Sequence, residues 1–182
     1  MVNFQQEKKL ILEFFNDLDS AKNEELVDII FKYTSDNFYM RCTHPFNEIK
    51  GAENVAKHLW EPIKNSFRPI QRRMDIFYAG INSHDTNQGT WVSSMGHLMG
   101  VFNKSFFGLQ PNNKSVLLRY AEFYKIENNK ITEGAFFLDL MNFMQQLGLS
   151  IIPESTGFVC VTPGPMNHQG LKFNLSDKNE GE

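Results

Sequence analysis

The sequence predicts an α+β fold in which helices come first and an antiparallel sheet follows. Apolar residues recur near i, i+3 and i+4 in residues 4–18 and again in residues 51–66, the spacing of a helix with one buried face. From residue 72 the period falls to two, as in strands with one buried face. Helices followed by consecutive strands are typical of an α+β domain rather than a doubly wound one. A chain of 182 residues is most simply one such domain.

The helical part is expected to contain three helices and one short strand. After the first helix, Asn23 is a suitable N-cap for a second helix through residues 26–31. Residues 37–42 are expected to form a strand, followed by a loop at residues 44–47. The third helix should run from Gly51 to about Ser66, and Pro62 should end or bend it.

Four strands are expected in the second half of the chain. Asn128 and Asn129 tolerate positive φ angles, so a tight hairpin is expected between the last two strands. The expected strands are residues 72–79, 90–102, 115–126 and 130–138.

Composition and charge exclude several classes of partner. The formal net charge is −3, which does not favour nucleic acid. Arg68, Arg72 and Arg73 are clustered, and we interpret them as a solvated strand edge. No run approaches the roughly 18 apolar residues of a membrane span, and no signal peptide is recognisable. Cys42 and Cys160 form no metal-binding or redox motif, so both are expected to be reduced and the chain cytoplasmic.

The second half of the chain carries an ordered series of motifs. They are Gly96-His97-Leu98-Met99-Gly100-Val101-Phe102, Phe107-Gly108-Leu109-Gln110-Pro111, Leu118-Arg119-Tyr120-Ala121-Glu122-Phe123, Lys130-Ile131-Thr132-Glu133, Leu138-Asp139 and Gln145-Gln146-Leu147-Gly148. In this order the motifs resemble the SnoaL-like polyketide cyclases of the nuclear transport factor 2-like superfamily. Upstream, His44-Pro45-Phe46 and the helix that carries Trp60 resemble the ester-cyclase branch. The chain departs from the common Gly-Thr-His-x-Gly pattern of the family, because both Leu98 and Met99 stand between His97 and Gly100.

The resemblance implies a half-open cone, in which a strongly curved antiparallel sheet wraps around helices and encloses an apolar pocket. It covers roughly residues 5–150. We therefore expect a cone domain over residues 1–149 and a Pro/Gly-rich tail over residues 150–182 that packs on it in part. Open curved sheets of this family commonly pair, so a homodimer is expected.

Asp139 stands among apolar side chains, and two explanations for it remain open. The resemblance implies a general acid/base at this position, between the last strand and the closing helix. An aldol closure needs a proton removed from the carbon next to a carbonyl, and a carboxylate can carry it. Alternatively, Asp139 is the N-cap of a helix over residues 140–146 and accepts a hydrogen bond from the backbone of Met141 or Asn142.

Three further polar residues are candidates for the same site. His97 and His44 carry imidazoles that can polarise a carbonyl or exchange protons, although a lone histidine is more often structural. Arg119 can hold an enolate or ester oxygen, or form a salt bridge across the sheet. Arg119 and Glu122 are three apart on a strand, so they should point to opposite faces.

Three aromatic residues are candidates for substrate binding. Trp60, Phe102 and Tyr39 can wall a pocket for a flat substrate, or simply belong to a core that the 17 Phe residues make large.

The resulting hypothesis is a cofactor-independent acid/base enzyme acting on a small apolar or polyketide-like carbonyl compound. It would be an aldol-type cyclase or a related isomerase or hydrolase. The sequence has no nucleophile elbow, phosphate-binding loop or dinucleotide fingerprint, and no histidine spacing typical of a metal site. The alternative is a non-catalytic binding or interaction domain of the same fold.

Overall fold

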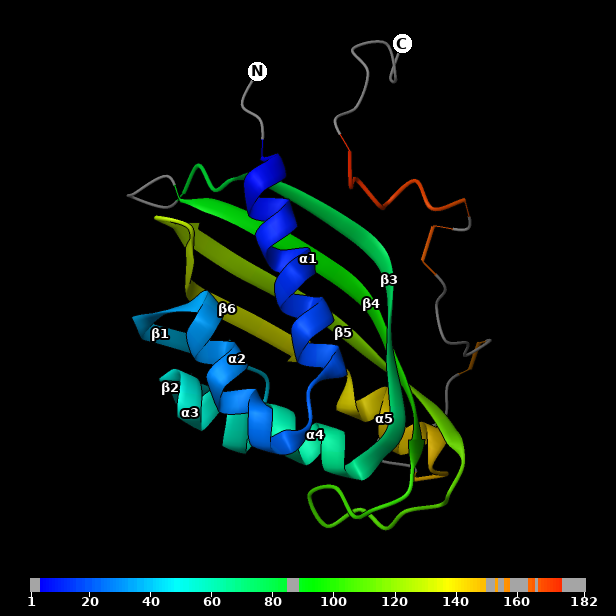
Figure 1. Ribbon diagram of the computed structural model, residues 1–182. Helices are drawn as coiled ribbons and strands as arrows, with labels where there is room; N and C mark the ends of the chain where they lie inside the picture. Colours follow the sequence, from blue (N-terminus) through cyan, green and yellow to red (C-terminus); the bar gives the residue numbers. More distant parts are fainter. Residues whose placement is uncertain are drawn as a thin grey trace.

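The computed structural model describes residues 4–84, 89–149, 153, 156–157, 164–165 and 167–174. One curled six-stranded sheet, in the order β2-β1-β6-β5-β4-β3, wraps around the helices without closing (Figure 1). The predicted α+β cone is therefore confirmed. The elements are α1 (Gln5–Ser20), η1 (Asn23–Glu25), α2 (Leu26–Tyr33), β1 (Thr34–Cys42), β2 (Glu48–Lys50), α3 (Ala52–Val55), η2 (Ala56–Trp60), α4 (Glu61–Ser66), β3 (Phe67–Ile81), β4 (Thr90–Phe102), β5 (Ser115–Glu127), β6 (Lys130–Leu138) and α5 (Leu140–Gln146).

The sequence predicts an antiparallel sheet, and this prediction is wrong for one strand pair. β1 runs parallel to β6. The other neighbouring strands are antiparallel. A parallel pair needs a crossover connection, and here β2, the helical segment from α3 to α4 and strands β3 to β5 lie between β1 and β6 along the chain. The hairpin between β5 and β6 is as predicted, with φ angles of 50° at Asn128 and 58° at Asn129.

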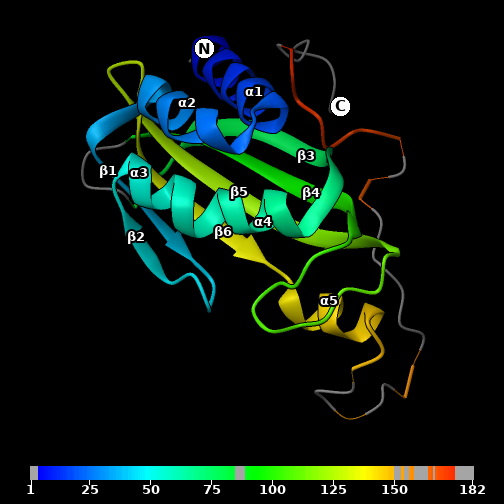
Figure 2. The same ribbon diagram turned by 60° about the horizontal axis from the view of Figure 1, so that its bottom comes forward.

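The helices cover the concave face of the sheet, and α5 lies at one end of the cone (Figure 2). α1 and α2 bury their apolar stripes there, and Phe14, Phe15 and Tyr33 make ring contacts with one another or with Tyr124 of β5. At the end near α5, Phe143 packs against rings from β3 and β4. No helix formed by the described residues is long and apolar enough to cross a membrane.

The third predicted helix continues past Pro62 instead of ending there. Residues 52–66 are helical throughout, but the segment Ala56–Trp60 is a π-helical turn, in which the backbone N–H of Glu61 donates to Ala56. Pro62 then falls in the first turn of α4, where a missing N–H costs little. The wide turn places Trp60, which is 3% exposed, inside the cone.

Part of the tail lies along β3, one of the two edge strands of the sheet. The backbone N–H of Phe77 donates to Gly170 at 2.7 Å, and the N–H of Lys172 donates to the carbonyl of Phe77 at 2.7 Å. The Nζ of Lys8 on α1 donates to the carbonyl of Lys172, which ties the same segment to the helices. We call residues 167–174 the edge segment. Cys160 lies outside the described residues.

Candidate functional site

Strand alternation decides on which side of the sheet each predicted site residue lies. In β4 and β5, Leu98 and Leu118 form a cross-strand pair in the core, and Glu122 is completely buried on the same inner face. His97 and Arg119 alternate with these residues, so they lie on the outer face. They are direct cross-strand partners. Arg119 and Glu122 therefore point to opposite faces, as predicted.

His97 is held by a carboxylate that the sequence did not indicate as a site residue. Its Nδ1 lies 3.1 Å from Oδ2 of Asp75, and its Nε2 is buried without a hydrogen-bond partner among the described residues. A bulge in β3 between Met74 and Ile76 shifts the strand register at Asp75. Gly96 allows this, because a Cβ there would collide with the carbonyl of Arg73. The tail contributes Gly164, which lies against the Asp75 side chain.

Asp139 is the N-cap of α5 and also faces a cation. Its Oδ1 accepts a hydrogen bond of 2.9 Å from the backbone N–H of Asn142, so the capping bond expected at this position is present. Its Oδ2 lies 4.0 Å from Nη1 of Arg119, and both side chains are 34% exposed. One carboxylate oxygen is thus occupied by the cap, while the other is directed to the guanidinium. A catalytic role for Asp139 stays a prediction.

Four polar side chains therefore lie in one line across β3, β4, β5 and the start of α5, and we call them the outer row. The line alternates acid, imidazole, guanidinium and acid. Like Nε2 of His97, Nε of Arg119 is buried without a partner among the described residues. The outer row consists of Asp75, His97, Arg119 and Asp139.

The other predicted site residues do not join the outer row. Trp60 and Phe102 are buried inside the cone, and Phe102 stacks on Phe67 at 5.3 Å in the core. Tyr39 lies on β1 beside Glu133, whose hydrogen bond raises the pKa of the Tyr39 hydroxyl, with burial adding to the shift. His44 is exposed in the loop after β1. The sheet separates Trp60 and Phe102 from His97 and Arg119.

A second polar cluster, which we call the inner network, is centred on Arg72. Our interpretation of Arg72 as part of a solvated edge is wrong, because its side chain is 3% exposed. Its Nη1 donates to Oε1 of Glu122 at 2.7 Å, and its Nε donates to Oδ2 of Asp19 at 2.9 Å. The hydroxyl of Tyr124 donates to the other oxygen of Glu122. Rings of Phe15, Tyr120 and Trp60 lie 4.2, 5.1 and 5.5 Å from the guanidinium.

Burial and charge oppose each other within the inner network. Burial raises the pKa of Glu122, and the neighbouring Arg72 guanidinium pulls it back down. Burial lowers the pKa of Arg72, but the carboxylates of Glu122 and Asp19 outweigh it, and the pKa stays above its usual value. A signal for Arg72 was present in the sequence, since it alternates with Ile70 and Met74 on an apolar face.

Cys42 offers a test of the electrostatics inside the cone. Burial, followed by the charge of Glu122, raises the pKa of its thiol to about 12. At pH 8 only about one thiol in ten thousand is then ionised, so iodoacetamide should label Cys42 very slowly in the folded protein. Peptide mapping by mass spectrometry separates Cys42 from Cys160, and labelling in urea gives the unperturbed rate. Equal rates in the folded and unfolded chain would contradict the burial of this thiol beside Glu122.

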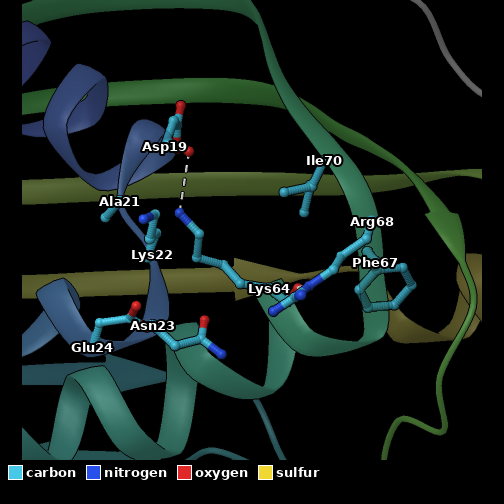
Figure 3. A pocket seen from close by; sticks show the side chains of 9 residues that line it. All are labelled: Asp19, Ala21, Lys22, Asn23, Glu24, Lys64, Phe67, Arg68 and Ile70. Atoms are coloured by element: carbon cyan, nitrogen blue, oxygen red, sulfur yellow. Dashed lines mark hydrogen bonds between the residues drawn. The ribbon is translucent and has the colours of Figure 1, made fainter.

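Among the described residues, three cavities are considered as ligand sites, and Asp139 lines none of these three. A cleft of about 430 Å³ opens between the end of α1, η1, α4 and the start of β3 (Figure 3). A void of about 10 Å³ lies against Trp60 and Arg72. A groove of about 350 Å³ on the outer face is lined mostly by apolar groups, including Trp91 and Phe123. Within the described part of the chain, no three His, Cys, Asp or Glu side chains gather as metal ligands would.

Comparison with known proteins supports the resemblance seen in the motifs. Residues 83–147 match the sequence profile of the family described as SnoaL-like polyketide cyclase. No curated protein matches the chain.

Solved structures named for polyketide cyclases, and one named for a hydroxylase, share the fold. One from Jannaschia sp. CCS1, named for a SnoaL-like polyketide cyclase, has 16% identity and a TM-score of 0.60, covering 81% of this chain and 94% of its own. One from Acidithiobacillus ferrooxidans, named for a polyketide cyclase, has 13% identity and a TM-score of 0.62, covering 81% and 98%. AclR from Streptomyces galilaeus, named for a hydroxylase, has 20% identity and a TM-score of 0.58, covering 81% and 85%. The profile match and the shared fold together confirm the resemblance to SnoaL-like polyketide cyclases, and they show that the chain has the fold of these proteins.

Proposed function

We propose that the chain is an acid/base enzyme that acts on a small carbonyl compound without a cofactor, using the outer row. The observation that carries the proposal is the pairing of His97 with Asp75, which leaves a buried ring nitrogen available beside Arg119. Perturbed or unpaired polar groups that gather in one place are typical of functional sites.

Each member of the outer row has a role in this chemistry. The Oδ2 of Asp139 takes a proton from the carbon next to a carbonyl, which leaves an enolate. In the form of His97 that carries a proton on each ring nitrogen, Nδ1–H donates to the Asp75 carboxylate, and Nε2–H and the Arg119 guanidinium stabilise the enolate oxygen. The enolate carbon then attacks a second carbonyl of the same molecule. The alkoxide that forms receives the proton from Asp139, so the carboxylate is regenerated.

The proposal is tested by proton exchange, which does not require the natural substrate to be known. The chain is incubated in D₂O with a panel of ketones and β-keto esters, and loss of the α-proton signal is followed by NMR. We expect exchange above the buffer rate for at least one compound. We expect His97→Asn to lower that exchange by about 10²-fold, the usual effect of removing one stabilising donor or proton-transfer group.

The matched control is His58→Asn, which removes an exposed imidazole from the opposite, helical side of the sheet. It should exchange protons at the rate of the unaltered chain. If no compound in the panel exchanges, or if both variants behave alike, the proposed acid/base role is overturned.

A second candidate function is ligand binding without turnover. Its supporting observation is that Oδ1 of Asp139 serves as a helix cap while the 430 Å³ cleft lies elsewhere on the molecule. A binding domain requires only volume and shape from its pocket. Binding that persists in the absence of any catalysed exchange would favour this candidate.

We also propose that the chain pairs with a second copy through the outer face of the sheet. This face exposes large aromatic side chains, with Tyr78 at 47% and Phe137 at 49%. Phe137 makes an edge contact with Phe123 at 6.1 Å, next to the outer groove. An apolar patch of this kind on a sheet face is typical of a protein interface.

Phe137→Arg should therefore convert a dimer into a monomer. A buried charge without a partner disfavours association, and analytical ultracentrifugation at several concentrations measures the change. The control is Phe31→Arg, because Phe31 is equally exposed at 50% but lies on α2. A chain that is already monomeric, or that stays dimeric with Phe137→Arg, would exclude this interface.

A further inference from the structure

The cleft between α1, η1, α4 and β3 has the size and charge of a ligand site separate from the outer row. Its volume of about 430 Å³ is in the range of small-molecule pockets. The cations Lys22, Lys64 and Arg68 line it, against the acids Asp19 and Glu24. Asp19 is already paired with Arg72, so the lining favours an anion. Figure 3 shows Lys64 reaching across the cleft to the end of α1.

Donors remain available on both central cations. The Nζ of Lys64 donates to the carbonyl of Leu18 at 2.6 Å and to that of Asp19 at 3.1 Å, which uses two of its three protons. Arg68 donates from Nε to the carbonyl of Lys64 and from Nη2 to Oδ1 of Asn65. The guanidinium of Arg68 has five N–H groups, so it also keeps donors that can face a ligand.

A small void lies directly next to the cleft. Asp19, Lys64 and Ile70 line both, and the void has a volume of about 10 Å³. This volume is close to the space that one water molecule or one hydroxyl group needs. Trp60 lines the void and is 3% exposed, yet its indole Nε1 has no hydrogen-bond partner among the described residues. A buried N–H without a partner is costly, so the void is suited to a group that accepts from it.

We propose that the cleft and the void form a binding site for a small hydroxy carboxylate. The ligand hydroxyl sits in the void, where it accepts from Nε1 of Trp60 and donates to the Asp19 carboxylate. The ligand carboxylate lies in the cleft against Lys64 and Arg68. A hydroxyl satisfies Trp60 and Asp19 at once, since the Trp60 indole offers only a donor and the Asp19 carboxylate only acceptors. This site lies on the helical side of the sheet, so it does not depend on the proposed chemistry of the outer row.

The two tryptophans make the test residue-specific. An ¹H–¹⁵N spectrum of the intact chain contains one indole signal for Trp60 and one for Trp91, and Trp91 lies on the outer face. Glycolate, lactate and larger hydroxy acids are titrated alongside the matching acids without the hydroxyl and the matching alcohols. We expect at least one hydroxy acid to shift the Trp60 signal saturably while the Trp91 signal stays in place.

Arg68→Gln should weaken that binding by about ten-fold, the usual effect of losing one charge-assisted hydrogen bond. Arg68 is exposed, so this substitution is expected to leave the fold intact. Arg73→Gln, an exposed arginine outside the cleft, is the control and should bind as the unaltered chain does. The proposal is overturned if no hydroxy acid moves the Trp60 signal, if the hydroxyl-free acids move it equally, or if both arginine variants bind alike.

Discussion

Replacing Arg72 by Met is expected to lower the free energy of unfolding by about 3–5 kcal/mol, the usual cost of removing one partner of a buried ion pair. Glu122 is 0% exposed and accepts its bond from Arg72 at 2.7 Å. Without the guanidinium, this carboxylate must either stay ionised in an apolar interior or take up a proton. Urea denaturation followed by circular dichroism measures the change.

The neighbouring residue provides the control for this prediction. Arg73→Met changes the same residue type on the same strand, but Arg73 is exposed, so a change within about 0.5 kcal/mol is expected. The double variant Arg72→Met with Glu122→Gln should lose less than the sum of the two single variants, because it leaves no unpaired buried charge. A loss for Arg72→Met no greater than that for Arg73→Met would show that the inner network is not an ion pair of this kind.

Replacing Asp139 by Asn is expected to lower the rate of any catalysed α-proton exchange by about 10²–10⁴-fold, because an amide cannot take up the proton. Asn caps helices about as well as Asp, so the hydrogen bond from the N–H of Asn142 is retained and the stability should be nearly unchanged. Asp139→Ala removes both the charge and the cap, and should cost about 1 kcal/mol in addition. Exchange by NMR and denaturation by urea, measured on the same samples, separate the two roles.

These two variants decide between the explanations of Asp139 that the sequence leaves open. Loss of exchange with Asp139→Asn at unchanged stability supports a proton-transfer role. If Asp139→Asn exchanges protons as fast as the unaltered chain and only Asp139→Ala is destabilised, Asp139 is a helix cap and nothing more.

The sheet was largely predictable because two local signals agree along it. The period of two fixes the extent of β4 and β6, and the Asn128-Asn129 turn fixes how β6 returns along β5. β2 was not predicted, because its three residues are too few to show a period. The π-helical turn before Pro62 was also not predicted, since only its backbone geometry removes the usual cost of the proline.

The candidate site was less predictable, because it depends on which face of the sheet each residue occupies. The clustered arginines suggest a solvated edge for Arg72. The alternation of side chains along β3 instead directs Arg72 into the cone, where it is the cross-strand partner of Leu98. Asp75 was not considered, because the bulge that shifts its register leaves no mark in the local sequence. His97, Arg119 and Asp139 were each identified from the motif series, but their arrangement in one row follows from the cross-strand register.

The position of the edge segment has a consequence for how the chain behaves at high concentration. A long strand at the margin of a sheet offers unpaired N–H and carbonyl groups to other molecules, which is a common route to aggregation. β3 has 15 residues, and the edge segment takes up the backbone groups of Phe77 in its central part. At the opposite margin, β2 is only three residues long, which itself discourages such pairing. A chain cut before residue 167 would expose β3 around Phe77 and would be prone to aggregate by edge-to-edge strand pairing.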